Sequence, residues 1–170
     1  FCSDKLRRLS VDIDLNYIGS PERGIMLNER PEIERIIIDI CQRMGYSLRR
    51  NPRAHSGGKM VFEYQSFSGN KGRIDVDINY MFRSPLWEAK ERTSLSWPKK
   101  VKTPVLDIHE LAAGKLHALL GREASRDLFD SHELLTSWSL DEKKLRQAFT
   151  VYAGMERDSW KTISVDNVKV

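Results

Sequence analysis

Two stretches of the chain alternate between apolar and polar side chains, which is the pattern of a β-strand with one buried face. Successive side chains of a strand point to opposite faces. Within residues 8–17, one face of the strand therefore carries the polar side chains of Ser10, Asp12, Asp14 and Asn16. Residues 73–80 repeat the arrangement with Asp75, Asp77 and Asn79. The sequence predicts two strands of the same design, each with an aliphatic face and an acidic face.

The segment between these strands predicts a helix and a hairpin. Apolar residues recur at helical spacing over residues 31–44, and Gly45 is a typical helix stop. Residues 46–67 then alternate as two strands, interrupted by the Pro- and Gly-containing stretch 51–58. We interpret these two strands as a hairpin, and residues 68–72 as a second turn before the acidic strand at 73–80.

The second half of the chain is predominantly helical. Residues 81–104 are irregular and basic, with three prolines and room for a short helix near residues 86–92. Trp87 and Trp97 lie in this stretch, and we interpret them as side chains that cover a core edge rather than as a platform for RNA bases. The following apolar periodicity predicts helices that start at residue 107, cover residues 125–138 and cover residues 139–154.

Composition describes an ordinary globular protein and excludes several classes. The 170 residues carry a net charge of +4, which is compatible with a nucleotide or nucleic-acid partner. No apolar run approaches the roughly 18–20 residues that span a bilayer, so we expect a cytoplasmic protein with no membrane partner. Two cysteines cannot form a disulfide framework, and the four histidines lack zinc-ligand spacing.

The acidic faces are the main candidate for chemistry. An Asp-x-Asp pair taken alone favours a half-buried strand with a solvated acidic face. If the two acidic strands are neighbours, however, up to four carboxylates share one patch, and opposed like charges destabilise a sheet. Either nearby Arg7, Arg8 and Arg73 or bound metal ions can compensate, and the residues alone leave both open. Mg²⁺ prefers such carboxylate oxygens together with substrate phosphates.

The helical half offers weaker candidates. Lys115 falls within an apolar stripe, where a lysine either extends to the edge, meets a carboxylate or contacts a ligand phosphate. Asp127 and Asp130 lie three residues apart on one predicted helix, and Arg122 precedes Arg126 by one helical turn. Ordinary ion pairs within a helix explain these four residues equally well.

Four separated blocks resemble the AbiEii-type toxin nucleotidyltransferases, which belong to the DNA-polymerase-β-like nucleotidyltransferase superfamily. The blocks are Arg-Leu-Ser-Val-Asp-Ile-Asp-Leu at 8–15, Val-Asp-Ile-Asn-Tyr at 76–80 with Arg83 and Pro85, Leu-Asp-Ile-His-Glu-Leu-Ala-Ala-Gly-Lys-Leu-His-Ala-Leu at 106–119, and Arg-Asp-Leu-Phe-Asp at 126–130. They occur in the family's order, and together they are far more specific than any one of them.

The resemblance implies an α+β fold, with a mixed sheet that carries the acidic face, flanking helices and a helical C-terminal part. We expect the nucleotidyltransferase-like core at residues 1–103 and the helical region at residues 104–170. The implied metal ligands for Mg²⁺ or Mn²⁺ are Asp12, Asp14 and Asp77, with Asp75 as the runner-up. The implied catalytic set adds Lys115 and Asp127 to these three aspartates. The implied contacts to the nucleotide are Ser10, Lys115, Arg122 and Arg126.

The resemblance also implies an activity and partners. The expected reaction moves a nucleoside monophosphate from an NTP to an acceptor hydroxyl, with tRNA or a protein as the acceptor. Such enzymes are often the toxin of a toxin–antitoxin or phage-defence pair, so a cognate antitoxin is an expected partner. The alternative is a catalytically degenerate member that serves as a binding module.

The sequence departs from the family at one motif. The family's Gly-Gly or Gly-Ser turn, which cradles the triphosphate at a helix N-terminus, does not precede the Asp-x-Asp strand here. We expect the sequence to begin after that turn, and we expect the chain as given to bind nucleotide poorly.

Overall fold

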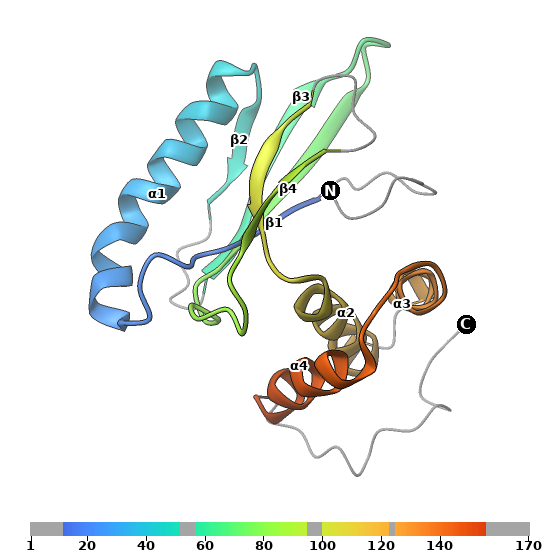
Figure 1. The fold of residues 1–170 in the computed structure, drawn as a ribbon. Helices are drawn as coiled ribbons and strands as arrows, with labels where there is room; N and C mark the ends of the chain where they lie inside the picture. The colour runs from blue at the N-terminus through green and yellow to red at the C-terminus, as the bar shows by residue number, and fades with distance from the viewer. Residues whose placement is uncertain (1–11, 52–56, 95–99, 123–124, 156–170) are drawn as a thin grey trace. The chain divides into compact units, whose positions relative to one another are not determined.

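The chain divides into two compact units, and each is described here by itself. The computed structural model describes residues 12–51, 57–94, 100–122 and 125–155 (Figure 1). The first unit, within Leu6–Ser84, holds a four-stranded sheet and one long helix. The second unit, within Pro85–Val170, holds a two-stranded sheet and three helices.

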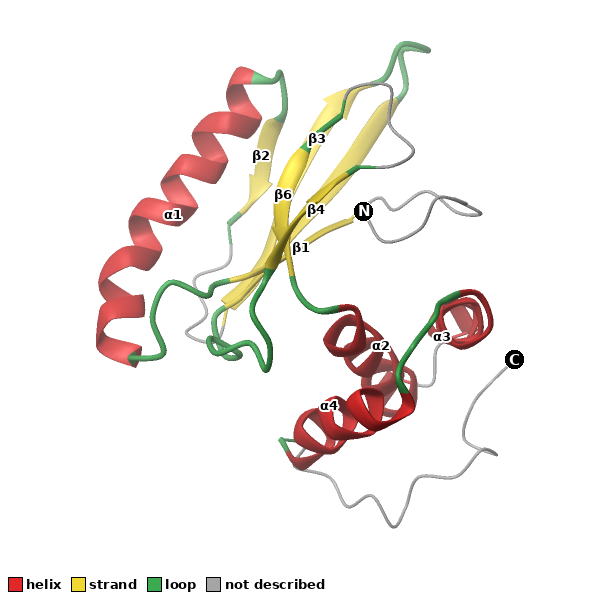
Figure 2. Cartoon of the chain, viewed as in Figure 1, coloured by secondary structure: helices red, strands yellow, loops and turns green. Residues whose placement is uncertain are grey.

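The sheet of the first unit is mixed, and the two acidic strands are neighbours in it. Its strand order is β1-β4-β3-β2 (Figure 2). The strands are β1 (Asp12–Asn16), β2 (Ser47–Arg50), β3 (Gly57–Gln65) and β4 (Lys71–Asn79). β1 runs parallel to β4, whereas β3 pairs antiparallel with both β4 and β2. The predicted hairpin is therefore confirmed, and the condition under which the two acidic faces form one patch is met.

Helix α1 (Arg23–Arg43) lies along one face of this sheet (Figure 1). The prediction that it begins at residue 31 was wrong, because Pro31 lies inside the helix. A proline within a helix removes one backbone hydrogen bond. The turns before Pro31 bury Met26 and Arg30 against the sheet, and this burial offsets that loss. Packing thus extended the helix beyond what local sequence signals predict.

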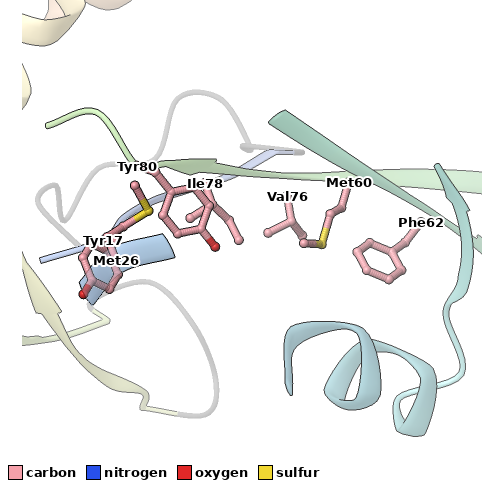
Figure 3. Close-up of a cluster of buried hydrophobic side chains, with 7 residues drawn as sticks. All are labelled: Tyr17, Met26, Met60, Phe62, Val76, Ile78 and Tyr80. Atoms are coloured by element: carbon pink, nitrogen blue, oxygen red, sulfur yellow. The ribbon is translucent and has the colours of Figure 1, made fainter. Parts of the chain in front are cut away.

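The core of the first unit fills the space between the sheet and α1. It consists of one cluster of buried side chains (Figure 3), which are Tyr17, Met26, Met60, Phe62, Val76, Ile78 and Tyr80. Strands β3 and β4 contribute most of them, since their alternate residues all point to the α1 side. The opposite face of the sheet is polar and has no helix of this unit upon it in the described residues.

The second unit begins with strands β5 (Lys90–Thr93) and β6 (Lys102–Val105), which pair antiparallel. The short helix predicted near residues 86–92 was wrong, since its second half is β5. Helix α2 (Ile108–Arg122) then packs against both α3 (Ser125–Ser137) and α4 (Glu142–Gly154). Asp141 caps α4 by accepting a hydrogen bond from the Lys144 N–H, so the helix starts later than the predicted residue 139.

The order of elements is that of an α+β protein, with the helices of the second unit following the strands, as predicted. The units meet in sequence at residues 84 and 85, which places β5 and β6 with the helices. The predicted boundary at residues 103 and 104 stays a prediction.

Candidate active site

The register of β1 against β4 places four carboxylates in two opposed pairs on the polar face of the sheet. Asp12 is the partner of Asp75, and Asp14 is the partner of Asp77. Partners on adjacent strands project their side chains to the same face, and neighbouring strands lie about 4.8 Å apart. The patch expected from the sequence therefore exists, and it is a two-by-two arrangement rather than a single row.

One of the four carboxylates already has cationic partners. Asp75 accepts hydrogen bonds from Nε and Nη2 of Arg73, at 2.6 and 2.9 Å. Lys59 on β3 adds an ion pair, with its Nζ 3.3 Å from Oδ2 of Asp75. Arg73 holds the pKa of the Asp75 carboxyl below its usual value against the opposing effect of burial, and Lys59 lowers this pKa further. The runner-up metal ligand is thus engaged in an ion-pair network.

The second pair, Asp14 and Asp77, differs, because Lys59 lies opposite Asp77 in the sheet but forms its ion pair with Asp75. Within the described part of the chain, neither carboxylate makes a hydrogen bond or an ion pair. Two unit charges about 5 Å apart repel by about 1 kcal/mol in water, and by about 3 kcal/mol at the effective dielectric constant of a protein surface. Asp14 is exposed and Asp77 is half-buried, so an ion from solvent can reach the carboxylate oxygens of both. This pair is the best-placed receptor for a cation.

Asp12 is intermediate between the ion-paired Asp75 and the pair of Asp14 and Asp77. It is half-buried, and its negative charge adds to the effect by which Asp75 raises the pKa of Arg73. The Arg73 guanidinium therefore senses both members of the Asp12 and Asp75 pair. Among the described residues, no three His, Cys, Asp or Glu side chains converge into a complete metal site. Two carboxylates suffice for Mg²⁺, however, which commonly completes its shell with waters and substrate phosphates.

Backbone contacts at the ends of the two acidic strands fix the patch in place. Asn79 ends β4 by accepting hydrogen bonds from the N–H groups of Met81 and Phe82, at 2.9 and 3.3 Å. Arg83 donates to the carbonyl oxygens of Tyr80 and Pro21, at 2.7 and 3.0 Å. The loop after β1 is thereby tied to the end of β4. Arg83 acts here as a structural link between the strands, and Asn79 forms a turn.

The sequence-predicted lysine lies in the second unit, on the side of α2. Lys115 is exposed, and its Nζ lies 3.3 Å from Oδ2 of Asp130 on α3. The expectation that Lys115 lies within the apolar stripe was wrong. The buried face of α2 instead includes the polar residues His109 and Glu110, which rotates the stripe away from Lys115. Of the alternatives for this lysine, the structure shows the contact with a carboxylate.

The other predicted residues are placed unequally. Asp127 is buried on the first turn of α3, on the side that packs against α2. Arg122 ends α2 and Arg126 lies in α3, but their side chains fall outside the described residues, as do Ser10, Arg7 and Arg8. Asp127 and Lys115 therefore share the second unit, whereas Asp12, Asp14 and Asp77 share the first.

A polar network in the second unit escaped prediction. Glu110 is almost fully buried and accepts hydrogen bonds from the backbone N–H of Trp87 at 3.3 Å and the hydroxyl of Tyr152 at 3.4 Å. Burial, together with the charge of Glu110, raises the pKa of Tyr152 to about 12. The only hint in the sequence is a glutamate in a position that otherwise fits an apolar face.

His109 links the starts of α2 and α4. Its Nδ1 lies 2.7 Å from Oδ1 of Asp107, and its Nε2 accepts a hydrogen bond from the Asp141 N–H at 2.8 Å. An acceptor role for Nε2 means that Nδ1 carries the proton and donates to Asp107. His109 is thus a buried packing residue, and both of its ring nitrogens are used at the junction of the two helices.

Comparison with known proteins identifies one family. The family described as "Nucleotidyl transferase AbiEii toxin, Type IV TA system" matches residues 1–167. A comparison with curated proteins finds no match. Across the described helices, none combines the length and apolar character that crossing a membrane requires.

Proposed function

Because the chain belongs to the AbiEii toxin nucleotidyl transferase family, we propose that it is a metal-dependent nucleotidyltransferase that moves a nucleoside monophosphate from an NTP to an acceptor hydroxyl. The observation that carries this proposal is the opposed pair of Asp14 and Asp77, which makes no ion pair among the described residues. Repulsion within that pair is relieved when a divalent cation binds. The family and the local electrostatics therefore favour the same site.

The residues of the first unit suit Mg²⁺ or Mn²⁺. Carboxylate oxygens of Asp14 and Asp77, with Asp12 beside them, are the hard ligands that these ions prefer. When bound, such an ion neutralises the phosphates and stabilises the charge that develops in phosphoryl transfer. The strand backbone holds the three aspartates at fixed spacing, so little ordering is needed when the substrate arrives.

The helical unit supplies the remaining proposed roles. Lys115 would exchange its contact with Asp130 for the phosphates of the nucleotide, because an exposed lysine loses little by leaving a surface ion pair. Arg122, Arg126 and Ser10 are proposed as further contacts to the nucleotide. Asp127 is proposed as a further active-site acid.

The acceptor and the biological partner follow from the family. A type IV toxin family implies a cognate antitoxin as the partner. We propose the 3′ end of a tRNA as the acceptor, with a protein hydroxyl as the competing substrate that the assay below also detects. In this proposal the enzyme acts in the cytoplasm, and phage defence is one setting in which such a pair would serve.

The test is transfer of label from α-labelled NTPs, supplied one at a time with Mg²⁺, to total RNA and total protein. Asp14→Asn and Asp77→Asn should reduce transfer at least about a hundredfold, as removal of a catalytic electrostatic group commonly does. Glu63→Gln is the matched control, because Glu63 is an acid on the same sheet face that pairs with Arg49. Absence of transfer with every NTP, by a protein shown to be folded and to bind NTP, would instead support a binding module.

A further inference from the structure

The hairpin of β3 and β4 extends beyond the strands on either side of it (Figure 1). β1 pairs with residues 75–79 of β4, and β2 pairs with residues 61–63 of β3. Among the described residues, 64–72 therefore pair only with one another, and we refer to them below as the hairpin arm. The arm belongs to the first unit and lies at the end of β4 that is far from Asp77.

Aromatic packing braces the hairpin arm. The ring of Tyr64 lies against Gly72 on the opposite strand, where an added Cβ would overlap that ring. Glycine at position 72 therefore allows the close approach of the ring to the backbone. The ring of Tyr46 meets the Tyr64 ring edge-on, with the ring centroids 5.6 Å apart. These contacts hold the arm in shape without a neighbouring strand.

The tip of the hairpin arm is an ordered turn. The N–H of Ser66 donates to the carbonyl oxygen of Asn70 at 2.8 Å, and the N–H of Gly69 donates to the carbonyl oxygen of Ser66 at 2.9 Å. Gly69 has a φ of +82°, in the left-handed region that glycine adopts without steric cost. Phe67 is the second residue of this turn, a position that does not require an aromatic side chain.

The ring of Phe67 is entirely in water. Its exposed fraction is 111%, and it makes no ring contact with any described residue. The side chains of Ser66, Ser68 and Asn70 surround it at the tip and hydrogen-bond with one another through hydroxyl and amide groups. The ring is therefore not part of a larger apolar patch. Because the fold does not use it, Phe67 is a candidate contact for a partner.

Lys71 places a positive charge beside the tip. It is exposed, and it makes neither a hydrogen bond nor an ion pair with the described residues. Its cross-strand partner is the neutral Gln65, and the next acid along β3 on this face, Glu63, forms its ion pair with Arg49. No acid therefore balances Lys71 locally. Alternation places Lys71 on the strand face of Asp77, about 20 Å away along β4.

We propose that the hairpin arm binds single-stranded RNA, with Phe67 stacked on an unpaired base and Lys71 in contact with the backbone. The inference rests on the proposed function for RNA as the acceptor, but the contact requires neither metal nor NTP. One aromatic ring among polar side chains suits a base, because every base has a face that can stack. A protein or membrane surface is more commonly met by a contiguous apolar patch. The distance to Asp77 places the stacked base several nucleotides from the reacting end.

The direct test is the binding of a fluorescein-labelled oligoadenylate of about twelve nucleotides, in EDTA and without NTP, followed by fluorescence anisotropy. Phe67→Ala should weaken binding about tenfold, and Phe67→Leu at least about fivefold, because leucine is apolar but has no ring to stack. Phe67→Trp should bind within about twofold of wild type. Phe129→Ala is the matched control, as an exposed phenylalanine of the second unit, and should change the affinity less than twofold.

Two results would overturn the stacking contact. One is unchanged binding in Phe67→Ala. The other is full binding in Phe67→Leu, which would show that the site needs an apolar side chain and not a ring, as a protein pocket does. Urea unfolding should give the same stability for Phe67→Ala and wild type, because the ring contacts no described residue.

The salt dependence of the same binding tests Lys71. Each phosphate that a protein neutralises on a single strand contributes about 0.7 to the slope of log K against log salt concentration. Lys71→Gln should reduce the slope by about that amount, whereas Phe67→Leu should leave it unchanged. Lys143→Gln, at an exposed lysine of α4, is the control and should also leave it unchanged. A wild-type slope in Lys71→Gln would contradict a backbone contact.

A further arm separates this inference from the proposed function. Asp14→Asn should retain oligoadenylate binding in EDTA even though it reduces transfer, so the two proposals can fail independently. In the transfer assay, Phe67→Ala should raise the KM for the RNA acceptor and leave both kcat and the KM for the NTP unchanged. An unchanged KM for the RNA would contradict a role for the hairpin arm in holding the acceptor.

Discussion

Strands β1 and β4 share the pattern Asp-x-Asp-x-Asn-Tyr and lie side by side in parallel register, yet they differ in burial. On the apolar face, Val76 and Ile78 of β4 are 2% and 3% exposed. Their partners Ile13 and Leu15 of β1 are 47% and 39% exposed. β4 lies between two strands, whereas β1 is at the edge of the sheet. The position of a strand in the sheet therefore decides how much of its apolar face is buried, even though the two strands share one sequence pattern.

The four acids also differ in their ion pairs. Asp75 on β4 is reached by Lys59 of β3, and Arg73 of its own strand completes the network. The paired Asp14 and Asp77 make no ion pair among the described residues, although Lys59 is the cross-strand partner of Asp77. Within one motif, Asp75 is therefore held in ion pairs, whereas Asp77 is placed with Asp14 to bind a cation.

Truncation of apolar side chains should give the largest difference in stability between β4 and β1. Ile78→Ala removes a fully buried side chain and should lower the free energy of unfolding by about 3 kcal/mol. Leu15→Ala at the edge should cost less than about 1.5 kcal/mol, because much of that side chain is already in water. Urea unfolding measures both values. Equal losses would contradict the assignment of β1 as a half-open edge.

The tyrosines that follow the two motifs should respond differently to alkaline pH. Burial, with a contribution from the charge of Glu34, raises the pKa of Tyr80 to about 12. A raised folded-state pKa stabilises the fold below the unfolded value of about 10, and this stability is lost as pH rises towards 12. Tyr80→Phe should remove about 2 kcal/mol of that pH dependence. Parallel stability curves for wild type and variant between pH 9 and 12 would contradict it.

Substitution of Asp75 and of Asp77 should change the stability of the metal-free protein at pH 7 in opposite directions. Asp75→Asn leaves Arg73 and Lys59 without their counter-ion and should cost about 1 kcal/mol. Asp77→Asn removes repulsion from Asp14 and should stabilise the fold by up to about 1 kcal/mol. Chemical unfolding in EDTA checks both signs.

The dependence of stability on acidic pH gives a second test of the ion pairs of Asp75. The folded-state pKa of Asp75 is lowered, chiefly by Arg73. Its stabilisation is therefore present above the unfolded value of about 3.9 and is lost as pH falls through the folded value. Asp75→Asn should flatten the curve in that range. A curve with the wild-type slope would show that the ion pairs contribute nothing to stability.

The smallest expected effect concerns the hydroxyl groups at the ends of β1 and β4. The Tyr17 hydroxyl donates to Oε2 of Glu29 at 2.6 Å, so Tyr17→Phe should cost about 0.5–1 kcal/mol. The buried Tyr80 hydroxyl has no hydrogen-bond partner among the described residues, so Tyr80→Phe should be neutral or slightly stabilising at pH 7. A larger loss in Tyr80→Phe than in Tyr17→Phe would contradict this reading.

Much of the sheet could be predicted from the sequence, because alternation and turn residues are local signals. The two acidic strands and the hairpin of residues 46–67 followed from them, whereas the parallel pairing of β1 with β4 did not. The start of α1 did not, since packing of Met26 against the sheet overrides the signal of Pro31. The β5 and β6 pair was missed for a similar reason, as four-residue strands in a proline-containing stretch carry almost no periodicity.

The site was predictable in its residue types and less so in its electrostatics. Alternation identified all four aspartates of the acidic patch. The division between Asp75 and Asp77 depends on which carboxylate the side chains of Lys59 and Arg73 reach, and sequence spacing does not contain that information. Likewise, the burial of Glu110 depends on Trp87 and Tyr152, which lie 23 and 42 residues away in the chain.

The central claim is that Asp14 and Asp77, and not Asp75, receive the metal ion. Calorimetric titration with Mn²⁺ tests it most directly, using wild type, Asp14→Asn, Asp77→Asn and Asp75→Asn, each first confirmed as folded. The account predicts at least about tenfold weaker binding in Asp14→Asn and Asp77→Asn, and less than about threefold weaker binding in Asp75→Asn. Loss of Mn²⁺ binding in Asp75→Asn, with binding retained in Asp77→Asn, would contradict it.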